Sequence, residues 1–179
     1  MSLIVAGIDP SVSGTAVCVL ESNDIIDLTT FVLPKDSKGI SRLNWLAIQL
    51  NKILKKNNPT EIFIEGYSFG SRGRSTITLG ELGGIFRLLL AKHWNGYYEV
   101  PPKTLKKFIT GNGNSKKQVM LEKTYRKYKV GSEILKNDNE VDAYCLARCG
   151  TAYLTRNKDS TFAQYEIDAL KGISAKCTL

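Results

Sequence analysis

The sequence has little histidine and no paired cysteines. Among its 179 residues, one is histidine and four are cysteine, and none of the cysteines forms a CxxC pair. One histidine is too few to complete a zinc site of the usual spacing, so the sequence argues against such a site. Cys18 lies in an apolar run, and Cys145 and Cys149 lie one helical turn apart. Free, mostly buried thiols in a reducing compartment explain these residues best.

Long hydrophobic runs are also missing. The most apolar stretch, Ile85 to Ala91, is short and contains Arg87, so we expect no membrane span. Met1 to Val5 lacks the basic start and the long apolar stretch of a signal peptide. Internal repeats, low-complexity segments and linker-like runs are absent as well. We therefore expect one domain that works in the cytoplasm, without a membrane partner.

Acidic residues are outnumbered by basic ones. Lys and Arg number 25 and Asp and Glu 17, which gives a formal net charge of +8. This surplus favours a polyanionic partner, nucleic acid first, although a generically basic protein would have the same balance. A hydrophobic content of 42% and a charged content of 23% are ordinary for a globular domain with a real core.

The hydrophobic pattern predicts an α/β fold in the order βββ-α-β-α-β-ααα. Expected strands cover Leu3 to Ile8, Gly14 to Leu20, Ile25 to Leu33, Glu61 to Glu65 and Tyr97 to Val100. Expected helices cover Ser41 to Lys56, Thr76 to His93, Lys103 to Ile109, Ser115 to Lys127, Glu140 to Leu154 and Thr161 to Leu170. Three strands with tight connections form an antiparallel meander, and the alternation that follows places helices on both sheet faces. We expect a domain over residues 1–155 and a helical tail over 156–179 packed on it.

Two carboxylates stand at the ends of apolar strands. Asp9 follows the first strand, where it is also able to serve as a turn residue. Glu65 ends the apolar segment Ile62 to Glu65. A carboxylate there is costly to desolvate unless it is paired or bound to a metal. If the two strands are neighbours, Asp9 and Glu65 hold a shared cation between them.

A third acidic segment, Asn137 to Ala143, begins a late helix. Asn137 and Glu140 fit a capping box, and acids near a helix N-terminus are stabilised by the helix dipole. Asp142 fits that structural explanation less well, because apolar residues follow it. Asp138 and Asp142 share a helix face, and Asn139 lies three residues before Asp142. Three separated carboxylate sites suit two Mg²⁺ or Mn²⁺ ions that act on a phosphodiester.

Lysines bracket a glycine-rich turn in the segment PPKTLKKFITGNGNSKKQV, residues 101–119. They are Lys103, Lys106, Lys107, Lys116 and Lys117. The glycines expose backbone N–H groups and the lysines supply charge, a combination that grips a DNA backbone. The structural alternative is a solvated helix–turn–helix.

Four blocks of this sequence resemble, in order and spacing, the motifs of RuvC-type Holliday junction resolvases. They are GIDPSVSGTA, IFIEGYSFG, VPPKTLKKFITGNGNSKKQV and NEVDAYCLA. The resemblance covers about residues 3 to 155 and is strongest to the shorter phage and prophage members. It implies an RNase H-like fold with a five-stranded mixed sheet, a homodimer, Mg²⁺, no small-molecule cofactor, and paired cuts across four-way DNA junctions.

The resemblance also implies residue roles. Asp9, Glu65 and Asp142 match the catalytic, metal-binding acids, and Lys106 and Lys117 match DNA-contacting lysines. The family usually has Asp or His three residues before the last acid, where this chain has Asn139. Asp138 or Glu140 must then complete the metal site, or Asn139 does so through its amide oxygen.

The loop after Glu65 carries aromatic and basic residues. In the family this loop holds an aromatic that stacks on bases near the crossover, a role that exposed aromatics beside basic residues suit. The predicted DNA-contacting residues here are Tyr67, Phe69, Arg72 and Arg74. We expect one of the two aromatics to pack in the core instead.

The helix that follows has glycines beyond its core stripe of Leu79, Leu82, Phe86 and Leu90. These are Gly80, Gly83 and Gly84, and each glycine inside a helix costs about 1 kcal/mol relative to alanine. We interpret them, with Ile77 and Leu88, as a dimer interface that another backbone approaches closely. The alternative is that the glycines fit this helix against its own sheet.

Three other functions fit parts of this pattern. An RNase H-like nuclease for flaps, other branched DNA or RNA–DNA hybrids has the same catalytic residues. A sugar-kinase or actin-like ATPase has a similar first phosphate loop, but it needs a second domain and a second phosphate loop. A non-catalytic junction-binding module would explain the asparagine at position 139.

Overall fold

A five-stranded mixed sheet runs through the computed structural model, which describes residues 2–67, 74–158 and 161–179. Its strands are β1 (Ile4–Asp9), β2 (Ala16–Glu21), β3 (Asp24–Thr30), β4 (Glu61–Glu65) and β5 (Tyr98–Val100). They lie in the order β3-β2-β1-β4-β5. The first three pair antiparallel, and β1–β4 and β4–β5 pair parallel. The predicted meander followed by parallel strands is confirmed.

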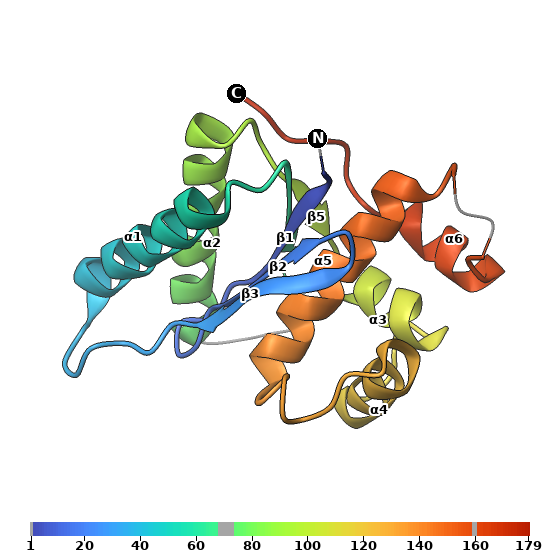
Figure 1. The fold of residues 1–179 in the computed structure, drawn as a ribbon. Coiled ribbons are helices and arrows are strands. Elements are labelled where there is room, and N and C mark those ends of the chain that lie inside the picture. The colour runs from blue at the N-terminus through green and yellow to red at the C-terminus, as the bar shows by residue number, and fades with distance from the viewer. Residues whose placement is uncertain (1, 68–73, 159–160) are drawn as a thin grey trace.

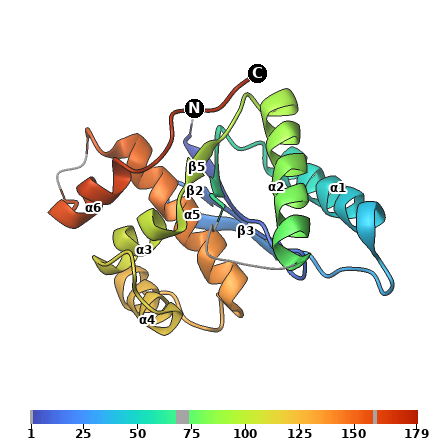
Figure 2. The ribbon, with the colours of Figure 1, turned by 180° about the vertical axis from the view of Figure 1, so that it is seen from behind.

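Helices cover both faces of this sheet (Figures 1 and 2). They are α1 (Gly39–Asn57), α2 (Arg74–His93), α3 (Pro102–Thr110), α4 (Lys117–Tyr128), α5 (Asp138–Thr155) and α6 (Gln164–Leu170). The long helices α1 and α2 lie on one face, and α5 crosses the other, with α3, α4 and α6 beyond it. The α/β class with helices on both faces is therefore confirmed.

Strand alternation divides the core into two layers. Val5 of β1 and Phe63 of β4 pack on the α5 side, in one hydrophobic cluster. Ala6 and Ile8 pack on the side of α1 and α2, in the other cluster. By the same alternation, Asp9 points to the α5 side of the sheet.

Gly7 allows α5 to approach β1 closely. A Cβ atom at this residue would lie 2.3 Å from the Ala143 carbonyl oxygen and 2.4 Å from the Ala147 nitrogen. Glycine is the only residue that leaves room for this contact. The close approach brings the first turns of α5, and with them Asp142, to the carboxyl end of β1.

The boundaries differ from the prediction mainly at two places. β3 ends at Thr30 rather than Leu33; the next residue, Phe31, still donates to the Thr15 carbonyl, and its ring packs edge-on against Trp45 of α1. The last helix begins at Gln164, three residues later than expected.

The C-terminal segment follows the outer edge of β5. Cys177 and Tyr97 exchange two backbone hydrogen bonds of 2.8 and 3.1 Å, which form an isolated antiparallel bridge. The carboxylate of Glu166 in α6 accepts a hydrogen bond from Lys127 of α4. In the part of the chain that the structure describes, no helix is long and apolar enough to cross a bilayer.

Candidate active site

Asp9 and Glu65 lie side by side at the carboxyl ends of two neighbouring parallel strands. Ile8 of β1 is paired with Ile64 of β4, so the next residue on each strand is an acid. Both side chains point to the α5 side, because they follow residues that face α1 and α2. The two carboxyl groups are close enough to share a hydrogen bond.

Asp142 joins them from the second turn of α5. Its negative charge raises the pKa of both Asp9 and Glu65, which brings the three predicted catalytic acids into one electrostatic cluster. The Lys117 ammonium of α4 lies 3.5 Å from Asp142 Oδ2 and 3.4 Å from Asp138 Oδ2. A cation from the chain itself thus faces the acidic cluster.

The electrostatics of this cluster favour a bound cation. Burial, then the charges of Glu65 and Asp142, holds the pKa of Asp9 well above its usual range. Burial, followed by the charge of Asp142, raises the pKa of Glu65 to about 7. Burial also raises the pKa of Asp142, although Lys117 opposes the shift. For Lys117 burial lowers the pKa, and the charges of Asp142 and Asp138 outweigh it to give a net rise. Three like charges packed this way need a partner of opposite sign to ionise together.

We expect the metal-free protein to lose stability as the pH rises from about 4.5 to about 7, the interval between the usual and the folded pKa of Glu65. Below this pH interval Glu65 is protonated in both the folded and the unfolded state. Within the interval only the unfolded state releases the Glu65 proton, and this release favours unfolding. Thermal unfolding with a chelator should follow this trend in the wild type and follow it less in Glu65→Gln. Parallel pH profiles for the two proteins would contradict the assignment.

The three remaining candidate ligands have different surroundings. Asp138 is 61% exposed and pairs with Lys117. The side-chain amide of Asn139 lies beside Gly14, 2.8 Å from the position that a Cβ atom would take. Glu140 is buried; its Oε1 accepts from Thr30 Oγ1 at 3.0 Å and its Oε2 from the Lys136 N–H at 2.7 Å. This geometry commits Glu140 to the start of α5 and leaves Asp138 and Asn139 as the freer candidates.

The predicted lysines lie on α3 and α4 around a cleft. A cavity of about 250 Å³ is lined by Glu65, Pro102, Leu105, Lys106, Lys117, Met120 and Asp142. Lys106 and Lys117 therefore stand beside the acids, whereas Lys103 and Lys116 are exposed and Lys107 is half-buried. The cleft combines carboxylates with two ammonium groups, as a phosphodiester substrate requires.

Tyr67 packs against α2 rather than standing free. Its ring lies under the Arg87 guanidinium, 4.0 Å from ring centroid to guanidinium carbon, and its hydroxyl donates to the Gly80 carbonyl at 3.4 Å. Tyr67 is thus a loop aromatic that packs against the protein. Phe69 and Arg72 lie outside the described residues, as does the side chain of Arg74, the first residue of α2.

The glycines of α2 fall into two classes. A Cβ atom at Gly83 would lie 2.7 Å from both Tyr67 Cε1 and Arg87 Nη1, so contacts within the chain explain this glycine. Gly80 and Gly84 have no atom of residues 2–67, 74–158 or 161–179 within 4 Å of the same position. Ile77 and Leu88 are 67% and 59% exposed, and they flank Gly84 on an open face of the helix.

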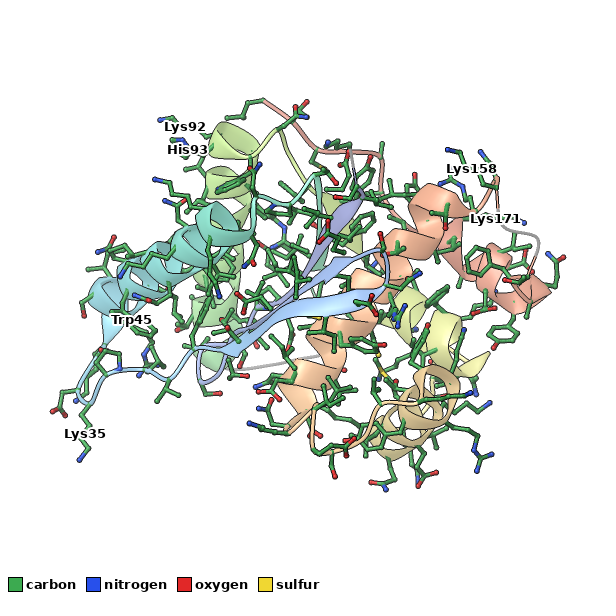
Figure 3. All side chains as sticks on the ribbon, viewed as in Figure 1. Lys35, Trp45, Lys92, His93, Lys158 and Lys171 are labelled. Atoms are coloured by element: carbon green, nitrogen blue, oxygen red, sulfur yellow. The ribbon has the colours of Figure 1, made fainter. Side chains whose placement is uncertain are left out.

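Sequence reasoning missed the part that Arg87 plays. Its guanidinium donates to the Glu99 carboxylate and to the Glu65 main-chain carbonyl. The one feature of the sequence that sets Arg87 apart is its charge inside the most apolar run, Ile85 to Ala91. The single histidine, His93, lies at the end of α2 remote from the site (Figure 3).

Comparison with known proteins identifies the family. The family model described as crossover junction endodeoxyribonuclease RuvC matches residues 5–149. The RuvC of Brachyspira hyodysenteriae is 28% identical over 160 residues, covering 87% of this chain and 96% of that protein. The RuvC of Caldicellulosiruptor saccharolyticus is 30% identical over 150 residues, covering 81% and 90%.

Solved structures agree on the fold. A Thermus thermophilus RuvC in complex with a Holliday junction substrate superposes with a TM-score of 0.73 at 15% identity, covering 87% of this chain and 96% of that one. The yeast mitochondrial Holliday junction resolvase superposes with a TM-score of 0.56 at 19% identity, covering 80% and 75%. The RNase H-like fold is therefore confirmed. With its motifs, its fold and a family match over most of its length, the chain belongs to the RuvC family of crossover junction endodeoxyribonucleases.

Proposed function

We propose that this protein resolves four-way DNA junctions by hydrolysing two symmetrically placed phosphodiester bonds in a reaction that requires Mg²⁺ or Mn²⁺. One observation carries the proposal: Asp9, Glu65 and Asp142, from three elements, form one acidic cluster beside a cleft that also contains two lysines. Family membership supports the substrate, since the related proteins are named crossover junction endodeoxyribonucleases.

The donor set fits hard divalent cations. Asp9, Glu65 and Asp142 offer carboxylate oxygens, and Asp138 or the amide oxygen of Asn139 completes the set for a second ion. In the described residues no three acidic, histidine or cysteine groups are already arranged as a metal centre. The Lys117 ammonium instead pairs with Asp138 and Asp142, at a place where a cation is electrostatically favourable. Bound metal supplies Lewis-acid stabilisation of the charge that develops on the phosphate.

The chain's own residues bind and orient the substrate. Lys106 and Lys117 bring positive charge to the cleft and attract the DNA backbone, and the exposed Lys103 and Lys116 extend this surface. Asp9 and Glu65 are held by paired strands, so their carboxylates need little reorganisation when the substrate arrives.

We also propose a homodimer, because paired cuts require two active sites. The open face of α2, with Ile77, Gly84 and Leu88, offers a surface for it. We further propose that the protein belongs to the phage and prophage branch and acts in the cytoplasm of a bacterium or an infected host. We also propose a nuclease domain over residues 1–155 with a helical tail over 156–179 packed on it.

A nuclease assay tests the activity directly. On a synthetic four-way junction with Mg²⁺, we expect paired nicks at symmetric positions, and no cleavage when a chelator replaces the metal. Flap, replication-fork and RNA–DNA hybrid substrates in parallel decide the specificity. Faster cutting of any of these would assign the protein to that substrate, and tight junction binding without cutting in any metal would make it a non-catalytic module.

A further inference from the structure

Arg87 links α2 to the end of the catalytic strand. Its side chain is 11% exposed, and its Nε lies 2.8 Å from Glu99 Oε2 on β5. Its Nη2 donates to the Glu65 carbonyl oxygen at 3.1 Å, and its Nη1 donates to the Gly83 carbonyl oxygen at 3.1 Å. Its guanidinium also covers the Tyr67 ring. One side chain therefore contacts two strands, the loop after β4 and its own helix.

The side chains around Arg87 are closely packed. Gly83 has no space for a Cβ atom beside Tyr67 and Arg87. Only a small cavity, about 40 Å³, remains among Pro10, Glu65, Gly66, Tyr67, Leu79, Gly83 and Arg87. Pro10 and Gly66 are the residues that follow Asp9 and Glu65, so the cavity borders the point where both strands leave the sheet. A shift of Arg87 would be transmitted to this point because the packing leaves little room to absorb it.

We infer that Arg87 is a positioning residue of the active site: by binding the main chain of Glu65 and the ring of Tyr67, it fixes the end of β4 so that the Glu65 carboxylate stays beside Asp9. The inference rests on the proposed function, since it assigns Glu65 to the metal-binding cluster. It also connects the site to α2, the helix with the proposed dimer face.

The structure gives a physical reason for a large effect. Removing the largely buried guanidinium takes a donor from the Glu65 carbonyl and the ion-pair partner from the half-buried Glu99 carboxylate, so the chain must rearrange there. A misplacement of about 1 Å at a reacting group costs roughly 100-fold in rate. Arg87 does not touch the cleft that binds the phosphodiester, so DNA affinity should not change.

Arg87→Met is the decisive variant, because methionine keeps an unbranched apolar arm under which Tyr67 still packs. We expect single-turnover cleavage of a four-way junction to slow about 100-fold at limiting Mg²⁺. The half-saturating Mg²⁺ concentration should rise, and junction binding in chelator should stay at the wild-type level. Arg87→Lys should recover part of the rate, since an ammonium is able to pair with Glu99 but not to make all the other contacts.

A matched control separates positioning from general stability. Lys56→Met removes an ion pair of the same 2.8 Å length, between Lys56 of α1 and Asp27 of β3, away from the site. It should keep the wild-type rate and the wild-type Mg²⁺ dependence. Arg87→Met with wild-type rate and Mg²⁺ dependence would overturn the inference, as would an equal loss in the control.

Two further measurements keep the test decisive. If Arg87→Met does not fold, Glu99→Gln is the substitute variant, because it removes the ion pair that holds the Arg87 guanidinium. An unchanged Mg²⁺ dependence of cleavage in Glu99→Gln would overturn the inference. If the wild type cuts no junction, the proposed function fails, but Mg²⁺ should still raise the unfolding temperature of the wild type more than that of Arg87→Met. Equal shifts, or no shift in the wild type, would then reject the role of Arg87.

Discussion

Asp9→Asn, Glu65→Gln and Asp142→Asn should each abolish cleavage of a four-way junction while junction binding is retained. Each change removes a carboxylate from the cluster at the ends of β1 and β4 and the start of α5. Metal ligation accounts for several kcal/mol of transition-state stabilisation, so we expect a loss of roughly three orders of magnitude or more. Affinity depends mainly on lysine–phosphate contacts, which the three substitutions leave in place.

The same variants should be more stable than the wild type in the presence of a chelator. Burial and like charges raise the pKa values of all three acids, so a neutral side chain relieves an unfavourable interaction. Measuring the unfolding temperature with and without Mg²⁺ checks this, and Mg²⁺ should stabilise the wild type more than any variant. If one of these variants cuts at the wild-type rate, the residue that it replaces is not part of the catalytic site.

Asp27→Asn is the matched control for these variants. Asp27 is buried like Asp9, but its carboxylate accepts hydrogen bonds from Thr29, Lys56 and Asn57. Burial raises its pKa, and these hydrogen bonds outweigh burial and lower it. Loss of its charge should reduce stability at neutral pH and leave cleavage intact, the opposite of the result for the cluster.

The strand pattern made the central part of the site predictable. Asp9 and Glu65 each end a run of apolar residues, and a buried run that ends in an acid indicates a partner at the sheet edge. Parallel pairing of β1 and β4 then places the two acids side by side. The N-cap of α5 was also predictable from the sequence, since Asn137 Oδ1 accepts a hydrogen bond from the Glu140 N–H. Glu140, however, bonds to the N–H of Lys136, one residue before the expected capping-box position.

Contacts between distant elements were not predictable. Lys117, the first residue of α4, meets Asp138 and Asp142 of α5 across a long separation in the chain. Arg87 binds residues of β4 and β5, and sequence spacing gives no information on such a convergence. Gly83 and Gly84 are alike in the sequence, yet Gly83 faces Tyr67, whereas Gly84 faces no neighbour in the described part of the chain.

Gly84→Glu should give a folded monomer that nicks junctions without coordination. Among the residues that the structure describes, none has an atom within 4 Å of a Cβ atom at Gly84, so a larger side chain fits the monomer. Replacing glycine in a helix by a better helix former favours folding by somewhat under 1 kcal/mol. In a two-fold dimer through this face, however, the same substitution buries an uncompensated charge on both subunits.

The expected loss of dimerisation is large. Each unpaired buried charge costs about 3 kcal/mol or more, and a two-fold dimer buries two of them, which raises the dimer dissociation constant by about four orders of magnitude. Light scattering over a range of concentrations measures this constant. Cleavage of a junction in a supercoiled plasmid distinguishes paired cuts, which linearise it, from single nicks. A monomer has one site and cuts one strand per encounter, so nicked circles should accumulate.

Asn44→Glu supplies the control, because Asn44 is exposed on α1 and the change introduces the same charge on the neighbouring helix. It should remain dimeric and linearise the plasmid.

A second variant on the same exposed face tests the interface independently. Ile77 and Leu88 flank Gly84 there, and Leu88→Asp should also give a monomer. A wild type that is monomeric at high concentration yet makes paired cuts would refute the α2 interface, as would a fully dimeric Gly84→Glu. A monomer produced by Gly84→Glu with unchanged single-strand nicking would show that each active site is complete within one chain, as the clustering of Asp9, Glu65 and Asp142 in a single protomer requires.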